Sequence, residues 1–147
     1  MKFSHKLSDA LHLLSYIVIC HDGDLSSRRI ASSIRTNPST VRSLMTDLRK
    51  AGLLKTQQGS AEPELAKDPK DISMYDVFRA VDMEHNLLHV DKDTEPRCIV
   101  GGNIQDTLAD AYAEVQAAAN AKMREISLQD IVDGILQAEA ERPDKRA

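Results

Sequence analysis

The chain has 147 residues, a formal net charge of -4 at pH 7, only 3% aromatic residues and no tryptophan. This length fits one domain, or a small domain with a helical extension, and so few aromatic side chains argue against a stacking platform for single-stranded nucleic acid. Two cysteines do not make a disulfide framework, and without a recognisable signal peptide or a long apolar span we expect a cytoplasmic protein with no membrane partner.

The first element in chain order is a predicted helix that begins near Ser4, a candidate cap, and ends before a turn at residues 21–24. Apolar residues recur along it at spacings of three and four, which predicts one buried face. That face comprises Leu7, Ala10, Leu11, Leu14, Ile17 and Val18. Lys2, near the N-terminal end, is either solvated or in contact with a DNA phosphate.

Residues 25–54 carry the pattern of a helix-turn-helix. Ser26 is placed to cap a short helix, which residues 35–38 then break. Asn37 is placed to cap the next helix, because the residue before a proline avoids the α region whereas Pro38 suits the first helical position. The inward residues of the first helix are predicted to be Ile30, Ala31 and Ile34.

The second helix of this pair separates an apolar stripe from a polar one. Its predicted buried residues are Val41, Leu44, Met45 and Leu48. Its predicted outward residues are Ser39, Thr40, Arg42, Ser43 and Thr46. Gly52 is expected to end the helix after Arg49 and Lys50, whose charges suit its negative dipole end. Small polar residues at the start of a capped helix are what a DNA major groove accepts.

Charge supports double-stranded DNA as the partner of this segment. Residues 25–54 contain six basic residues against Asp47 alone, a net charge of +5, so the remainder of the chain sums to -9. A basic module inside an acidic protein is expected where one surface meets phosphates. The alternative is a solvated helical hairpin without a partner.

A β-hairpin is predicted directly after the helix pair. Residues 53–57 and 64–66 are its candidate strands, and residues 58–63 between them are rich in turn-forming residues. Pro63 is expected in the turn or at an edge position, because proline cannot donate to a strand ladder. A hairpin in this place is the wing of a winged-helix fold.

Two further helices are predicted to begin with capping boxes, Ser73 with Asp76 and Ser127 with Asp130. The second is expected to end near residue 136, before a flexible tail over residues 139–147. The first is expected to run to about residue 81. Its residues predicted to pack on the first helix of the chain are Tyr75, Val77, Phe78 and Val81.

A long helix is predicted from Asn103, ahead of the second capping box. Its apolar residues alternate at spacings of four and three, as in the seam of a helix that packs along another helix. The seam comprises Ile104, Leu108, Ala111, Val115 and Ala118. Because this seam is narrow and rich in alanine, it predicts a homodimer interface, and packing against its own domain is the alternative.

Several runs of residues, in this order, resemble the Rrf2 family of bacterial winged-helix transcription regulators, the family of IscR, NsrR and CymR. The runs are residues 1–4 (MKFS), 30–31 (IA), 37–44 (NPSTVRSL), 48–53 (LRKAGL), 72–81 (ISMYDVFRAV) and 98–104 (CIVGGNI). They cover nearly the whole chain. The resemblance implies a homodimer that is joined through the long helix, binds a pseudo-palindromic operator and usually represses transcription.

Two departures from the family pattern limit these implications. Members that hold an iron–sulfur cluster use three closely spaced cysteines between the two later helices, where this chain has only Cys98. Cys20 lies in the first helix, and His85 and His89 cannot by count replace the missing thiolates, so we expect no cluster, metal or other cofactor. Residues 62–64 (EPE) replace the paired glycines and basic residue common in the wing, and carboxylates there would repel phosphates.

Cys98 itself has two interpretations. It precedes Gly101 and Gly102 and the start of the long helix, whose positive dipole end lowers a thiol pKa, so it is a candidate redox sensor. Alternatively, it is a small apolar residue tucked beside Ile99 and Val100.

The sequence therefore predicts a mainly α protein with a winged helix-turn-helix domain (residues 1–82), a connecting loop (83–103) and dimerisation helices (104–138). No catalytic motif is present, so we expect no enzyme activity. The predicted DNA contacts, with Arg42 favouring guanine, are Arg28, Asn37, Ser39, Thr40, Arg42, Ser43, Arg49 and Lys50. The competing hypothesis is a winged-helix dimer that has lost DNA affinity and binds a protein or small molecule.

Overall fold

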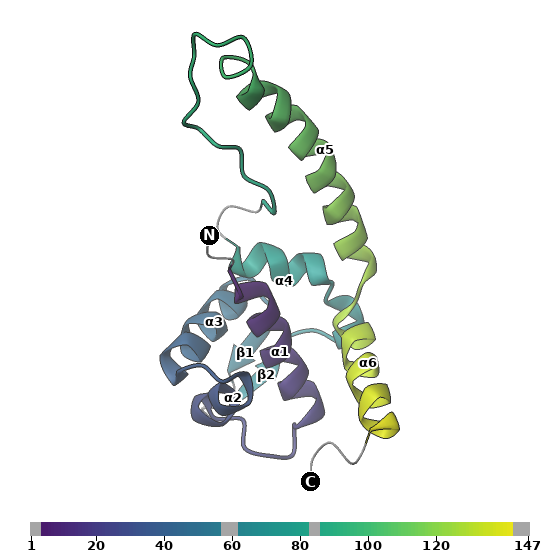
Figure 1. Cartoon of the computed structure of the whole chain (residues 1–147). Helices are drawn as coiled ribbons and strands as arrows, with labels where there is room; N and C mark the ends of the chain where they lie inside the picture. Colours follow the sequence, from purple (N-terminus) through teal and green to yellow (C-terminus); the bar gives the residue numbers. More distant parts are fainter. Residues whose placement is uncertain (1–3, 57–61, 83–85, 143–147) are drawn as a thin grey trace.

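The computed structural model describes residues 4–56, 62–82 and 86–142, which form a helical body and one long helix that extends from it (Figure 1). The body contains α1 (Lys6–Ile19), α2 (Ser27–Ile34), α3 (Pro38–Lys50), β1 (Leu54–Thr56), β2 (Pro63–Leu65), the 3-10 helix η1 (Pro69–Asp71), α4 (Met74–Val81) and α6 (Leu128–Glu141). The extended helix is α5 (Ile104–Glu125). The element order is that of the predicted winged helix. Lys2 and His85, on which two sequence hypotheses rest, lie outside the described residues.

Helix α1 is the centre of the body, and its burial differs in part from the prediction. Its buried residues are Ala10, Leu13, Leu14, Ser15 and Ile17. The prediction omitted Leu13, and it placed inside three residues that are only half-buried, Leu7, Leu11 and Val18. The reason is that α1 is contacted on several sides, by α2, α3, α4, α6 and β2, so spacing alone does not select one stripe.

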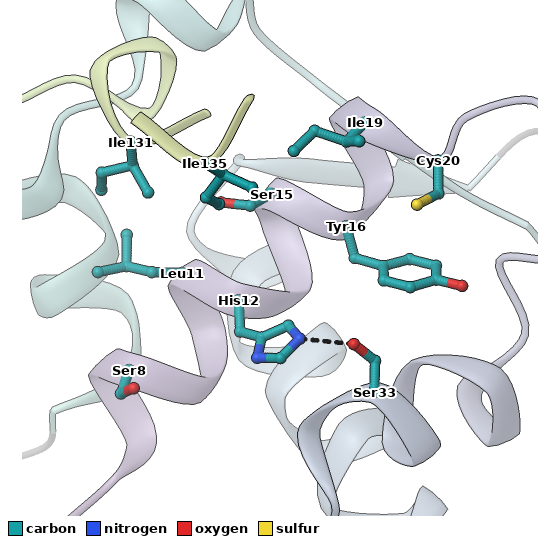
Figure 2. A pocket seen from close by; sticks show the side chains of 10 residues that line it. All are labelled: Ser8, Leu11, His12, Ser15, Tyr16, Ile19, Cys20, Ser33, Ile131 and Ile135. Carbon is teal, nitrogen blue, oxygen red and sulfur yellow. Dashed lines mark hydrogen bonds between the residues drawn. The ribbon is translucent and has the colours of Figure 1, made fainter. Parts of the chain in front are cut away.

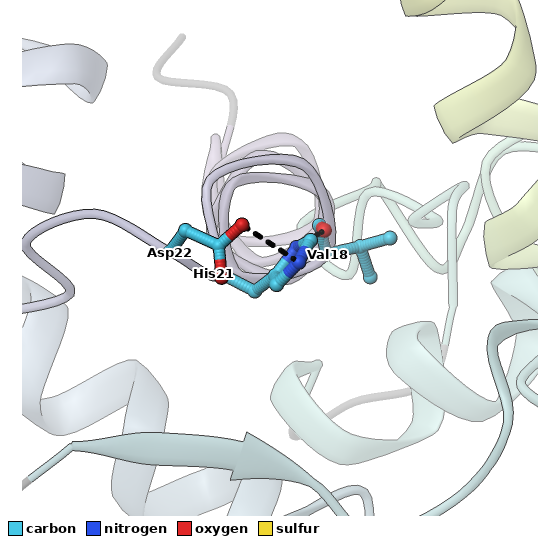
Figure 3. Close-up of polar contacts among 3 residues, drawn as sticks. All are labelled: Val18, His21 and Asp22. Carbon is cyan, nitrogen blue, oxygen red and sulfur yellow. Dashed lines mark hydrogen bonds and ion pairs between the residues drawn. The ribbon is translucent and has the colours of Figure 1, made fainter.

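Short-range contacts lie at the two ends of α1. His5 holds the cap position without a side-chain hydrogen bond, so the predicted cap at Ser4 is wrong, and the Ser4 Oγ accepts a bond from the N–H two residues on, at 3.3 Å. After α1 the predicted turn is present. There the His21 Nδ1 lies 3.0 Å from the Val18 carbonyl oxygen, and its Nε2 lies 3.3 Å from the Asp22 Oδ2 (Figure 3).

Helices α2 and α3 form the predicted helix-turn-helix, with the predicted residues at their ends. The Ser26 Oγ accepts a hydrogen bond from the Arg29 N–H at 3.2 Å, and the Asn37 Oδ1 accepts one from the Thr40 N–H at 2.9 Å. Gly52 has a φ of 78°, and the N–H groups of residues 52 and 53 bond back to the last turn of α3 at 3.0 and 2.9 Å. All four residues of the predicted apolar stripe of α3 are buried.

Strands β1 and β2 form the predicted antiparallel hairpin. The register pairs Leu54 with Leu65, Lys55 with Glu64 and Thr56 with Pro63. Pro63 is the first residue of its strand in a two-stranded sheet, a position that tolerates the missing N–H. Residue 57 and most of the predicted turn, residues 58–61, lie outside the described residues.

Helices α4 and α6 begin side by side. Both predicted capping boxes are present, at Ser73 and at Ser127. These two residues form an antiparallel backbone bridge, flanked by backbone hydrogen bonds of 2.7 and 2.8 Å. Leu128 and Val132 are buried in the same core cluster as the residues of α1, so α6 is part of the body.

Helix α6 is longer than predicted. It runs to Glu141, because no proline stands between residue 136 and Pro143 to stop it. The first three residues of the predicted tail are therefore helical, and residues 143–147 lie outside the described residues.

Helix α5 meets the body near its C-terminal end, at α4 (Figure 1). Its buried residue is Met123, and the Arg124 guanidinium carbon lies 4.1 Å from the centroid of the Tyr75 ring. This cation–π contact explains why Tyr75 is half-buried rather than in the core, as had been predicted. The other three predicted core residues of α4 are buried. No helix in the described ranges is both long and apolar enough to cross a membrane.

Candidate nucleic-acid interface

The outward face of α3 carries the predicted base-reading residues. Ser39, Arg42 and Ser43 are exposed, and Thr40 is half-buried. On the opposite side of α3 the buried stripe packs into the core, which holds the polar face toward solvent. A fixed helix that presents small polar residues and an arginine has the shape and the donor pattern that major-groove reading needs.

Asn37 organises the start of α3. Its Oδ1 accepts hydrogen bonds from the Thr40 N–H at 2.9 Å, from the Thr40 Oγ1 at 3.0 Å and from the Ser39 Oγ. Asn37 was predicted to contact DNA. Its side-chain oxygen instead caps the start of α3. The hydroxyls of Ser39 and Thr40 both donate to Asn37, so their free lone pairs can only accept hydrogen bonds. They therefore favour base edges that donate, such as the amino groups of adenine and cytosine.

Thr46 extends this polar face toward the end of α3. Its Oγ1 donates to the Arg42 carbonyl oxygen at 3.0 Å and lies 3.4 Å from the Arg49 Nη2. Arg49 is thus held along the outer face of the helix, and Lys50 beside it is also exposed. Their charges lie at the end of α3 opposite to its capped start, a place suited to phosphate contacts.

Three arginines of α2 and of the turn after it add positive charge. Arg28 and Arg29, in the first turn of α2, are exposed. Arg35, which follows the last residue of α2, has φ 64° and ψ 48°, the left-handed conformation that favours glycine. Arg35 was not among the predicted contacts. Because Arg35 is exposed and holds a strained conformation, it is a further candidate for phosphate binding.

A groove of about 370 Å³ between α1 and α3 borders the predicted base-reading residues, since Ser39, Thr40 and Ser43 line it. Lys6 and Asp9 of α1, which the sequence analysis did not single out, and Asp47 of α3 line it as well. Two carboxylates against one ammonium make this flank of α3 unfavourable for phosphate. The flank with Arg42 and Arg49 is therefore the one suited to approach the DNA backbone.

The wing is acidic in its described part, as the sequence indicates. Glu62 is exposed, and Glu64 is half-buried. The register places Lys55 opposite Glu64, which offsets one of the two carboxylates. The wing therefore adds no net positive charge, and α3 with its neighbouring arginines is the main candidate surface.

Cys98 lies in the loop before α5 and is exposed, and its neighbours Ile99 and Val100 are 84% and 62% exposed. The interpretation of Cys98 as an apolar residue tucked beside them is therefore wrong. Backbone N–H groups of Gly101 and Val100 hold the pKa of Cys98 below that of an ordinary cysteine. A Cβ on Gly101 would collide with the Glu95 backbone, so the turn that presents these N–H groups requires glycine.

The residues present do not fit an iron–sulfur cluster. Cys20 stands at the end of α1 and Cys98 in the loop before α5, and both are free thiols. Within the described ranges, no group of three or more His, Cys, Asp or Glu side chains could hold a metal ion. Cluster ligation needs several thiolates in one place, which two separate cysteines do not provide.

The helix-turn-helix, the hairpin wing and the polar, basic face of α3 together define a winged-helix DNA-binding protein. Residues 3–134 match the profile of the Rrf2 family, described as an iron-dependent transcriptional regulator. The chain belongs to this family, a family of transcription regulators, as its residue runs indicated. The family description mentions iron, but the two cysteines of this chain are too few and too far apart to hold an iron–sulfur cluster.

Individual relatives agree with this assignment. YwnA of Bacillus subtilis (strain 168), named as a candidate HTH-type transcriptional regulator, is 38% identical over 128 residues, 87% of this chain and 95% of YwnA. A crystal structure described as a candidate DNA binding protein is 36% identical, with a TM-score of 0.69 over 86% of this chain and 97% of that one. T. potens IscR shares the fold, with a TM-score of 0.69 at 21% identity over 95% of this chain and 91% of IscR.

Proposed function

We propose that the chain is a homodimeric transcription regulator, acting as a repressor, that reads a pseudo-palindromic operator with α3. The observation that carries this proposal is the capped α3, whose buried stripe fixes it while Ser39, Arg42 and Ser43 are exposed within a basic segment. The Arg42 guanidinium is proposed to bond a guanine through two N–H groups. The residues proposed to contact phosphates are Arg28, Arg49 and Lys50.

The homodimer is proposed to form through α5. Over 22 residues this helix buries only Met123 among its described side chains, and Val115 in the predicted seam is 50% exposed. A long helix with an uncovered apolar seam is stabilised by a second helix along that seam. Two-fold symmetry would then present two α3 helices to two half-sites, which a pseudo-palindrome matches.

Cys98 is proposed as the site of a redox response. Its exposed thiol has a lowered pKa, which favours the thiolate. The thiolate sulfur attacks the O–O bond of a peroxide, which gives a sulfenic acid on Cys98 and, after proton transfer, water or an alcohol. Because this loop precedes α5, oxidation would act on the arm proposed to join the two copies.

The DNA-binding proposal is tested with the reduced protein and the DNA upstream of its own gene, against random DNA of equal length. Three phosphate contacts in each protomer predict a slope of about -5 for log affinity against log salt concentration. Tight, sequence-dependent binding with such a slope would support the proposal. Weak binding to both duplexes with a shallow slope would contradict it and favour the module that binds a protein or small molecule.

The redox proposal is tested in the same assay after peroxide treatment. The oxidised protein is expected to change its affinity for the upstream DNA, and the Cys98→Ser variant is expected to keep the affinity of the reduced protein. If peroxide changed the DNA affinity of the unaltered chain and of the Cys98→Ser variant equally, the response would arise at a residue other than Cys98.

A further inference from the structure

A groove of about 540 Å³ runs between α1 and α6 and reaches the last turn of α2 (Figure 2). No residue of α3 lines it, so it is separate from the proposed DNA-reading face. Its volume lies in the range of about 300–1,000 Å³ that is typical of small-molecule sites. The sequence analysis assigned no function to these residues.

The walls of the groove are mainly apolar. Leu11 and Ile19 of α1 face Ile131 and Ile135 of α6, and the ring of Tyr16 lies on the α1 side (Figure 2). Side chains of this kind would bury the apolar body of a small ligand, and the Tyr16 ring offers a face for stacking.

Two polar features lie within this apolar surface. The His12 Nε2 and the Ser33 Oγ, on α1 and α2, are hydrogen-bonded at 2.8 Å (Figure 2). Ser15 is only 2% exposed, and its Oγ has no hydrogen-bond partner among the described residues. The Oγ is almost completely covered, so a ligand atom would reach it only by displacing the side chains around it; such a bond would satisfy a hydroxyl whose burial without a partner is costly.

Charge defines the class of ligand. Among the described residues that line the groove there is no lysine, arginine, aspartate or glutamate. An ionised ligand would lose its hydration without gaining a carboxylate, lysine or arginine as a partner. An uncharged ligand does not carry this desolvation cost. We propose that this groove binds a small uncharged molecule with an apolar, preferably aromatic, body and one hydrogen-bonding group directed at Ser15.

The position of the groove also suggests a role for such a molecule. It would contact α1 and α6 of the core and Ser33 of the helix-turn-helix at the same time. A ligand that holds these three helices in one arrangement acts on the orientation of α2 and α3. This effector role rests on the proposed function, whereas occupancy of the groove does not.

The binding site is tested by titrating the DNA-free full chain with N-phenyl-1-naphthylamine, a neutral fluorophore with one N–H group. Saturable fluorescence with one probe per chain is expected. Ser15→Ala, which removes only a hydroxyl without a partner, is expected to fold and to weaken binding by about two- to ten-fold. The sulfonated analogue 1-anilinonaphthalene-8-sulfonate is expected to bind more weakly, because no lysine or arginine lines the groove.

A matched pair of tryptophan variants locates the probe. Ile135 lines the groove, whereas its neighbour Leu136 does not, and the two are 44% and 48% exposed. Ile135→Trp is expected to fill the groove and abolish saturable binding, and Leu136→Trp is expected to leave it unchanged. The bound probe should also slow alkylation of Cys20, which lines the groove, and not that of Cys98.

Three outcomes would overturn the proposal. The first is equal binding to the Ile135→Trp and Leu136→Trp variants, and the second is unchanged affinity in Ser15→Ala. The third is loss of probe binding as the protein self-associates at higher concentration, which would assign the groove to a second copy of the chain. Because no DNA is present, none of these results depends on whether the protein binds an operator.

Discussion

The body and the α5 arm of this molecule differ in where their apolar side chains lie. Helix α1 buries five of its 14 residues, whereas α5 has one buried residue, Met123, in 22. The body thus has a core of its own, built from α1–α4, the wing and α6. An exposed helix gains little from propensity alone, so α5 is the part of the molecule whose stability should depend on a partner.

Polar contacts hold the loop before α5 against the arm. The Gln105 Nε2 donates to the Lys92 carbonyl oxygen at 3.0 Å and to the Thr94 Oγ1 at 2.7 Å, and the Gln116 Oε1 accepts from the Leu87 N–H at 2.7 Å. Of the predicted seam, Ile104 and Leu108 are half-buried at this end of α5, whereas Ala111, Val115 and Ala118 remain exposed.

The largest effect is expected in the body. Leu13→Ala removes a fully buried side chain, so it should lower the free energy of unfolding by about 2–5 kcal/mol in urea denaturation. Leu136→Ala, at a side chain that is 48% exposed, should change it by no more than about 0.5 kcal/mol. Similar losses in the two variants would contradict the assignment of the core.

On the arm, Val115→Asp should convert the dimer into monomers, because a carboxylate in the seam would be buried without a partner. Sedimentation equilibrium measures the mass, and circular dichroism checks that the helices remain. Ala113→Asp is the matched control, since it adds the same charge two residues away on the opposite side of α5. If both variants, or neither, remained dimeric, the proposed seam would be wrong.

At the DNA-reading face, Arg42→Ala should cost about 1–3 kcal/mol on the operator and much less on random DNA. Arg97→Ala removes the same charge from an exposed arginine in the loop before α5, and its operator affinity should change little. Equal losses on operator and random DNA would reduce the role of Arg42 to phosphate contact.

A smaller effect is expected at the turn between α2 and α3. Arg35→Gly relieves a left-handed conformation, so it should raise the free energy of unfolding by up to about 1 kcal/mol. If Arg35 contacts a phosphate, the same variant binds all DNA sequences more weakly, with a lower salt slope. A loss of stability would show that the arginine side chain makes contacts that outweigh the backbone strain.

The smallest effect concerns the chemistry of Cys98. In a Cys20→Ser background, the rate of iodoacetamide alkylation should rise at lower pH in the folded protein than in urea. The reason is that the N–H groups of Gly101 and Val100 lower the pKa of Cys98 only while the turn is folded. The same midpoint pH in both states would contradict this account.

The helix-turn-helix was predictable because its signals are local. Ser26, the Asn37-Pro38 pair and Gly52 act within a few residues of their own position, and each performs the predicted role at a helix end. The polar face of α3 follows from helical spacing once these ends are known. The exposure of Ser39, Arg42 and Ser43 was therefore predictable from the sequence.

The contacts between distant segments were not predictable in this way. Spacing shows that α6 has an apolar face, but not that Leu128 and Val132 pack into the core beside α1. Tyr75 fits an apolar pattern, yet Arg124, which is 49 positions later, draws it to α5. The groove at Ser15 also depends on tertiary structure, because α1, α2 and α6 form it together, so the sequence carries no signal for it.

In the proposed dimer, α5 joins two copies so that two α3 helices read one operator. Sedimentation equilibrium of the protein with a duplex from its own upstream DNA tests this most directly, because it counts chains on each duplex. Two chains per duplex are expected, with both dimer and complex lost in Val115→Asp and kept in Ala113→Asp. One chain per duplex at full affinity, or an unchanged complex in Val115→Asp, would contradict the claim.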